Sequence, residues 1–253
     1  LLGAISPPAD QVIATLDGRE ASLRIVELPA GAAKRVSDVL PFELDEVVPF
    51  EIEDAIIDHQ PVDRSDTILR VMATAIPTER VGRRLGELKE LGLDPSEIGV
   101  GAAAVAGLRH LRPELKSAQT QLILMIDLDH TEVCILHAGA CVFARTLGGG
   151  TEELRAGGRR FAGDLKRTLA SYRASGGQAI GEVFVAGEAA LYPDSILPWV
   201  GEITGLDANV LALPDSPGAD ASLRPRFATS TALAGRAVAR ARRLNARQGE
   251  FAH

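Results

Sequence analysis

The stretch from residue 121 to 154 constrains the fold more than any other part of the sequence. It reads QLILMIDLDHTEVCILHAGACVFARTLGGGTEEL, with short apolar and β-branched runs separated by glycines. This pattern predicts buried strands at 122–126, 131–136 and 141–146. An acidic bend beginning at Asp127 separates the first two strands, and three glycines after the third lead into a helix. We therefore expect two successive hairpins at the centre of a domain.

The remaining segments alternate between strand and helix patterns. An Asp17-Gly18 pair between two alternating runs predicts a β-hairpin near the start of the chain. Further strands and helices follow from apolar spacing and from glycine and proline breaks. Strands are expected at 11–16, 21–28, 55–60, 68–76, 183–186 and 209–213, and helices at 34–40, 79–91, 96–110, 151–173, 195–204 and 227–244. A chain of 253 residues with this alternation is long enough for two α/β domains.

Composition excludes several classes of protein. Hydrophobic residues make up 46% of the chain, which is typical of a globular protein and not of a disordered one. Cys134 and Cys141 form no disulfide or metal framework, and we expect buried thiols in a reducing compartment. No apolar run is long enough to span a bilayer. The sequence begins at Leu1 without methionine, which predicts a piece of a longer protein.

Charge is distributed unevenly along the chain, whose net charge is -7. One segment carries ten acids and a single base, and a later segment carries seven arginines and no acid. The two readings are solvated surface, or an acidic docking face and a basic juxtamembrane segment. Nucleic-acid binding is disfavoured because the chain is acidic and its arginines lack aromatic neighbours. The acids are Asp38, Glu43, Asp45, Glu46, Glu51, Glu53, Asp54, Asp58, Asp63 and Asp66, and the arginines lie between 224 and 247.

The bend after the first central strand has some features of a phosphate-binding turn. Asp127 could hold a metal-bound water, and Thr131 offers a hydroxyl. Asp129, however, stands where a glycine would let backbone amides approach a phosphate, and it adds negative charge. A second strand–glycine turn, Gly187-Glu188, has a glutamate at its second glycine position. The alternatives are a nucleotide site and a vestigial turn, and we favour the vestigial turn at both places.

Other motifs offer little chemistry. Gly148-Gly149-Gly150 could cradle an anion at a helix N-terminus, but Glu152 and Glu153 already occupy that positive end. His130 beside the two aspartates is a weak candidate for a metal site. No P-loop, G-x-S-x-G or Cys–His motif is present in the sequence. We therefore expect no catalytic residue, no bound cofactor and no metal.

Four segments together resemble one family of proteins. They are VLPFELDEVVPFEIEDAIIDHQPV at 39–62, ILHAGACVFARTLGGG at 135–150, VAGEAALYP at 185–193 and ARRLNARQGEF at 241–251. They are similar to the cytoplasmic domain of GspL, the inner-membrane platform protein of type II secretion, and to its relative PilM of type IV pilus assembly. The resemblance covers almost the whole chain, and its most specific part is the LNARQGEF ending, which in GspL proteins precedes a transmembrane helix.

The resemblance implies an actin-like, ribonuclease H-type fold of two lobes, related to FtsA. On this basis we expect a first lobe at 1–120, truncated at its start and containing a small α+β subdomain at about 23–95. The second lobe would span 121–245, and 246–253 would be a juxtamembrane tail. The implied location is the cytoplasmic side of a bacterial inner membrane, with an anchoring helix after this chain.

The implied function is a non-enzymatic scaffold that recruits the secretion ATPase GspE through that enzyme's N-terminal domain, beside GspM and GspF. Glu51, Glu53 and Asp54 are the candidate docking residues, chosen for charge density. A homodimer is a further expectation that the sequence leaves open.

The alternative is a PilM-like protein that binds ATP and a PilN-type peptide. Three departures from the PilM pattern favour the scaffold. An opening phosphate motif is missing, Asp129 and Glu188 replace glycines, and the insertion between Gly150 and the following long helix is reduced. Nucleotide binding separates the two hypotheses.

Overall fold

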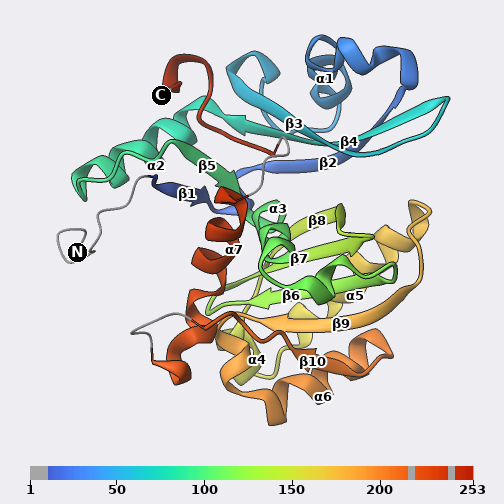
Figure 1. The fold of residues 1–253 in the computed structure, drawn as a ribbon, viewed down its shortest axis with the longest axis vertical. Helices are drawn as coiled ribbons and strands as arrows, with labels where there is room; N and C mark the ends of the chain where they lie inside the picture. The colour runs from blue at the N-terminus through green and yellow to red at the C-terminus, as the bar shows by residue number, and fades with distance from the viewer. Residues whose placement is uncertain (1–10, 216–219, 239–242, 253) are drawn as a thin grey trace.

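The computed structural model describes residues 11–215, 220–238 and 243–252. It has two lobes, one above the other in Figure 1, and helices α3 (Gly101–Val105) and α7 (Ala228–Ala237) lie between them. The first and last described elements, strand β1 (Ile13–Leu16) and the 3-10 turn Gly249–Phe251, both belong to the upper lobe in this view.

The lower lobe is built on a five-stranded sheet in the order β10-β9-β6-β7-β8. Its strands β6, β7 and β8 form the two predicted antiparallel hairpins, and β9 and β10 add in parallel to the other side of β6. Every residue of β6 is buried, because both faces of the sheet are covered. The strands are β6 (Thr120–Ile126), β7 (His130–His137), β8 (Ala140–Gly148), β9 (Ile180–Ala186) and β10 (Ala208–Val210).

Each face of this sheet packs against different helices. Alternate residues of β6, such as Leu124, pack on one face against Phe161 and Val200, from α5 (Arg159–Ala174) and α6 (Pro193–Thr204). The residues between them, such as Ile123, join a second cluster with Val100 and Ala232 of the layer between the lobes. Successive side chains of β6 point to opposite faces of the sheet, so the strand contributes to both hydrophobic clusters.

The upper lobe contains two smaller sheets. Strands β1 (Ile13–Leu16) and β5 (Glu97–Val100) pair in parallel, and α3 follows β5 directly. A three-stranded antiparallel sheet in the order β2-β4-β3 carries a separate core with α1 (Val36–Asp45). Helix α2 (Thr78–Glu90) connects the two sheets. The three strands are β2 (Ser22–Pro29), β3 (Ala55–Arg64) and β4 (Ile68–Pro77).

The hairpin predicted at Asp17-Gly18 is wrong. The two flanking strands pair with β5 and β4, in different sheets, and not with each other. Asp17 instead caps a short 3-10 turn by accepting a hydrogen bond from the backbone amide of Arg19. The turn is therefore not a hairpin turn, and long-range pairing decided where each strand went.

Three predicted helices also differ from the structure. The first part of 96–110 is strand β5, since its apolar residues pair with β1. The predicted helix at 151–173 is divided into α4 (Thr151–Arg155) and α5, with Gly158 in the left-handed region at φ 61° between them. The predicted helix at 227–244 is described as α7 only to Ala237, and residues 243–248 are not helical. Its segment 239–242 lies outside the described residues.

The C-terminal segment docks onto the upper lobe. The Ala246 backbone amide donates to the Ile98 carbonyl at 2.8 Å, and the Asn245 side chain accepts from the Ile98 amide at 3.0 Å. The Asn245 amide in turn donates to Asp58 of β3. Leu244 and Ala246 are fully buried between these strands. The segment is thus bonded to β5 and ties the β1–β5 sheet to the three-stranded sheet.

Candidate functional site between the lobes

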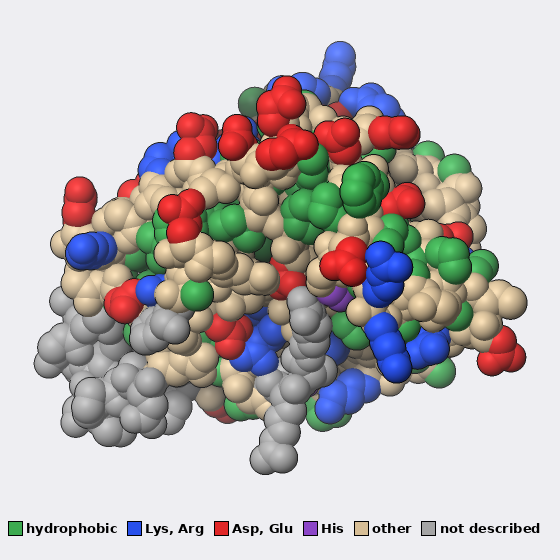
Figure 2. Space-filling model, turned by 90° about the horizontal axis from the view of Figure 1, so that it is seen from above, with side chains coloured by type: hydrophobic (Ala, Val, Ile, Leu, Met, Phe, Trp, Pro, Cys, Tyr) green, Lys and Arg blue, Asp and Glu red, His purple; other side chains and the backbone are tan. Residues whose placement is uncertain are grey.

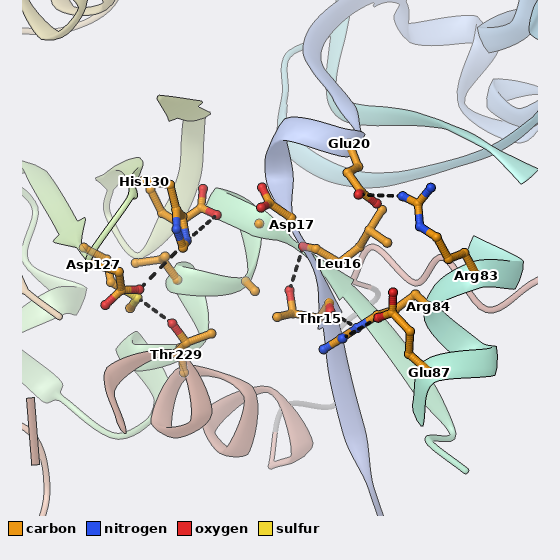
Figure 3. A pocket seen from close by; sticks show the side chains of 16 residues that line it. Thr15, Leu16, Asp17, Glu20, Arg83, Arg84, Glu87, Asp127, His130 and Thr229 are labelled. Atoms are coloured by element: carbon orange, nitrogen blue, oxygen red, sulfur yellow. Dashed lines mark hydrogen bonds and ion pairs between the residues drawn. The ribbon is translucent and has the colours of Figure 1, made fainter. Parts of the chain in front are cut away.

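A cleft of about 320 Å³ lies between the lobes. Figure 3 shows residues from β1 and its turn facing residues from α2, from the β6–β7 bend and from α7. Titratable side chains dominate its lining, and the two closest pairs from the upper lobe are Arg83–Glu20 and Arg84–Glu87. The acidic bend singled out in the sequence forms one wall of this cleft.

The backbone of that bend is already hydrogen-bonded to the helix after β8. The amides of Gly149, Thr151 and Glu152 donate to the carbonyls of Asp129, Asp127 and Leu128 at 2.9–3.0 Å. These amides include those at the N-terminus of α4, where a phosphate would bind. These amides already donate hydrogen bonds to the carbonyl oxygens of the bend, so they are not available to bind a phosphate.

The predicted acid and hydroxyl are held by groups of the same lobe. The Thr131 hydroxyl is buried and donates to the Gly149 carbonyl at 2.8 Å. Asp127 accepts a hydrogen bond from the Glu188 amide at 3.3 Å. Burial raises the pKa of Asp127 above its ordinary value. Asp127 therefore lines the cleft, whereas the Thr131 hydroxyl is used in a hydrogen bond within the lower lobe.

Asp129 forms a contact across the cleft. Its carboxylate accepts from Arg19 of the upper lobe at 3.0 Å and pairs with His130 Nδ1 at 2.9 Å. Arg19 also binds Asp17 through two nitrogens, and these bonds outweigh burial and lower the pKa of Asp17. Both partners of the Arg19–Asp129 pair are substantially exposed, so the pair contributes at most about 1 kcal/mol.

Glu188 is buried and paired rather than open to the cleft. Arg226 binds its two carboxylate oxygens at 2.7 and 3.1 Å. The glutamate therefore fixes the segment before α7 to the turn after β9. This partner lies 38 positions away in sequence, and no local pattern indicates it.

Glu132 and His130 form the most perturbed electrostatic group of the cleft, and sequence reasoning missed Glu132. Glu132 lies on β7, receives a hydrogen bond from Thr146, and is 5% exposed. Burial raises its pKa to about 7. Burial opposes the charge on His130, but the bond to Asp129 and the nearby Glu132 outweigh it and raise the His130 pKa. A lone acid inside the apolar run TEVCIL was the available signal.

This arrangement does not fit a nucleotide phosphate at the predicted turn. The amides of Gly149, Thr151 and Glu152 are bonded to the bend, and carboxylates of Asp127 and Asp129 line the approach. His130 does pack near Asp127 and Asp129, as the weak metal hypothesis required. Within the described residues, no group of three or more acidic, histidine or cysteine side chains has an arrangement that would hold a metal ion.

The predicted docking residues are not among those that line the cleft. Glu51, Glu53 and Asp54 are exposed on a short turn at the start of β3, in the small α+β part of the upper lobe. Figure 2 looks onto the molecule from this side, and acidic side chains gather along one margin with hydrophobic side chains beside them. Phe42, on the exposed side of α1, is 79% exposed. Sequence analysis did not single out this aromatic residue.

The arginine-rich C-terminal segment binds its own chain wherever the structure describes it. Arg224 pairs with Asp215, and Arg226 with Glu188. The remaining described arginines bind acids of the upper lobe, and their side chains are 4–20% exposed: Arg236 and Arg243 at Glu97, and Arg247 at Asp94. Two more arginines, Arg240 and Arg242, lie outside the described residues. The described helices include none that is long and apolar enough to cross a membrane.

No protein-family model matches the sequence, and no curated protein is significantly similar to it. Solved structures do match. A PilM–PilN type IV pilus biogenesis complex aligns over 90% of this chain and 80% of that chain, with a TM-score of 0.73 and 20% identity. The cytoplasmic domain of EpsL, an inner-membrane component of the type II secretion system of Vibrio cholerae, aligns over 95% and 78%, with a TM-score of 0.52 and 15% identity. The resemblance seen in the sequence therefore extends to the fold, and the chain has the actin-like α/β fold.

Proposed function

We propose that this chain is a non-enzymatic scaffold on the cytoplasmic side of a bacterial inner membrane, in the platform of a type II secretion system. It recruits the secretion ATPase, GspE, through that enzyme's N-terminal domain, and lies beside GspM and GspF. The fold shared with the EpsL cytoplasmic domain supports this assignment. The single observation that carries the non-enzymatic part is the occupied bend, whose carbonyls accept from the α4 amides.

The cleft supports a framework role. Glu188 is held by Arg226, and Thr131 is held by the Gly149 carbonyl, so neither side chain is free to meet a substrate. A buried, fully paired polar group fixes the surrounding backbone and costs several kcal/mol to disrupt. A bend whose buried glutamate and hydroxyl are held by the chain itself suits a docking platform.

The small α+β part of the upper lobe is the proposed docking surface, which we define as Phe42, Glu51, Glu53 and Asp54. Phe42 is exposed on α1, and α1 contacts the turn that carries Glu53 and Asp54. In protein interfaces an aromatic anchor supplies affinity and charge supplies orientation. The expected partner surface is basic with an apolar pocket.

Charge reversal tests this surface. We expect Glu51→Lys, Glu53→Lys and Asp54→Lys together to weaken binding of the GspE N-terminal domain at least tenfold in calorimetry, and Phe42→Ala to weaken it by a similar factor. The matched control reverses Asp194, Glu202 and Asp207, which are exposed on the lower lobe. Equal binding by the test and control variants would place the interface elsewhere. Absence of binding by the unmodified chain would overturn the proposed function.

A PilM-like role, in which ATP and a PilN-type peptide bind, is the second candidate. Its support is the high structural similarity to the PilM–PilN complex and the persistence of a cleft of about 320 Å³ between the lobes. Calorimetry with Mg-ATP separates the two. Saturable binding that Arg83→Glu abolishes would favour the PilM-like role, and no binding would favour the scaffold.

A further inference from the structure

A second cavity, of about 390 Å³, lies on the other side of the helical layer from the cleft. In the α3 region, Ala104 and Val105 line the cleft, whereas Ala103 and Ala106 line this second cavity. Helix α7 also contributes to both hollows, because Ala232 lines the cleft and Arg236 lines the second cavity. The two hollows are therefore separate sites that share one wall.

The lining of the second cavity is basic. Four of its residues carry a positive charge, and none of its described residues is an acid: Arg109, Lys116, Arg236 and Arg243. Two carboxylates act on these groups: Glu97 is shared by Arg236 and Arg243, and Asp58 also acts on Arg236. Such a gathering of cations is unexpected on a chain whose net charge is -7.

The electrostatics of the neighbouring groups agree with an excess of positive charge. Burial lowers the pKa of His110, and the fields of Arg109, Lys116 and Arg243 lower it further. Burial also lowers the pKa of Arg236 to about 10. A concave, basic, partly desolvated space strengthens the attraction of an anion, because field lines concentrate there.

The walls of the cavity are fixed by contacts of their own. Arg109 donates to the Gly139 carbonyl in the β7–β8 turn and to His110 Nε2. Ala138, in the same turn, has a φ of 47°, a left-handed conformation that side chains rarely adopt without tertiary support. The turn is therefore held in place beside the basic groups, and the cavity is preorganised.

We propose that this second cavity binds a phosphate group. Guanidinium groups match phosphate oxygens geometrically, and a lysine adds a point charge. The volume is large enough for a phosphate with a small organic part, within the range of ligand pockets. Two sources share this chemistry, a free phosphorylated molecule and the headgroup of a phospholipid.

The test measures pyrophosphate binding to the full chain by calorimetry. We expect saturable binding that weakens at least tenfold in Lys116→Glu. Lys116 is exposed and lines the cavity, so its replacement leaves the buried core intact. Lys166→Glu makes the same charge change on the exposed side of α5, outside the cavity, and should leave binding within twofold. Arg83→Glu, in the cleft, should also leave it unchanged.

Two further arms identify the source of the phosphate. Preferential sedimentation with phosphatidylglycerol vesicles over phosphatidylcholine vesicles, lost in Lys116→Glu, would assign a lipid headgroup. Pyrophosphate binding without vesicle binding would assign a free ligand. The proposal is overturned if pyrophosphate does not bind, if Lys116→Glu and Lys166→Glu weaken it equally, or if Arg83→Glu alone abolishes it.

Discussion

At the scale of single residues, two titratable side chains dominate the electrostatics of the cleft. Glu132 is buried with an elevated pKa, and His130 beside it also has an elevated pKa. Each binds a proton more tightly in the folded chain than in the unfolded chain. By linkage, both contribute stability at low pH that is lost as pH rises through the folded pKa values.

Glu132→Gln tests this linkage. An unfolded glutamate titrates near 4.5, and the folded one near 7, so the free energy of unfolding of the unmodified chain should fall between these pH values. In the variant, the free energy of unfolding should decrease much less over this pH range. The variant should therefore be more stable than the unmodified chain at pH 8 by roughly 1–3 kcal/mol. Urea unfolding at several pH values measures it. Glu90→Gln, an exposed acid on α2, is the control and should leave the slope unchanged.

Asp129 and Glu188 offer a second test at this scale. If their carboxylates alone exclude nucleotide, Asp129→Gly with Glu188→Gly should restore Mg-ATP binding. We expect no binding, because the amides of Thr151 and Glu152 remain bonded to the bend carbonyls. The double variant should also lose about 1 kcal/mol of stability, because the ion pair between Glu188 and Arg226 is removed and water solvates the exposed Arg226. Calorimetry gives the answer, and micromolar binding would show that charge was the barrier.

At the scale of elements, the turn after β1, helix α3 and strand β8 approach one another closely at two glycines. A Cβ placed on Gly101, at the start of α3, would lie 2.5 Å from the Cα of Gly18, and one placed on Gly18 would overlap Thr146 of β8. The turn after β1, helix α3 and β8 can approach this closely only without side chains at these positions. The shared apolar cluster then holds the lobes together, since the Arg19–Asp129 pair contributes little.

Gly18→Ala should therefore destabilise the chain by about 1–3 kcal/mol through overpacking. Gly86→Ala is the matched control, because nothing lies within 4 Å of its added Cβ on helix α2. That control should stabilise the chain by about 0.5–1 kcal/mol, the helix preference of alanine over glycine. Thermal unfolding of both variants compares them, and equal melting temperatures would show that the interlobe contact is loosely packed.

At the scale of the whole molecule, the C-terminal segment joins three parts of the upper lobe. Asn245 and Ala246 bond to β5 and β3, and Arg247 binds Asp94 and the Phe251 carbonyl. Burying Leu244 alone contributes about 2 kcal/mol. The segment is therefore part of the fold and is bonded to both upper sheets.

Asn245→Ala tests this coupling. It leaves the Ile98 amide without an acceptor and should lower the free energy of unfolding by about 1–3 kcal/mol. Hydrogen exchange should show faster exchange across β5 and β3 together, as expected if the segment couples the two sheets. Asn209→Ala, exposed on β10, is the control. Faster exchange confined to the C-terminal segment would mean that it does not support the sheets.

Local patterns predicted the central hairpins closely, and they predicted most other strands and helices in approximate position. The apolar runs of β6 and β7 are long enough to predict buried strands from the local sequence alone. The predicted hairpin at Asp17-Gly18 failed because strand pairing depends on partners far along the chain, β5 and β4. The candidate site followed the same rule: Asp127 and Asp129 were found from sequence, whereas Glu132 was missed, because its burial arises only when α3 covers β7.

The sequence by itself determined the α/β class, the order of the central strands and the acidic bend, because these depend on neighbours within a few residues. Tertiary structure alone decided that Glu188 meets Arg226, that the bend carbonyls occupy the α4 amides, and that the basic residues from 109 to 243 surround one cavity. These features join residues from distant segments, and their energies exist only once the lobes have packed together.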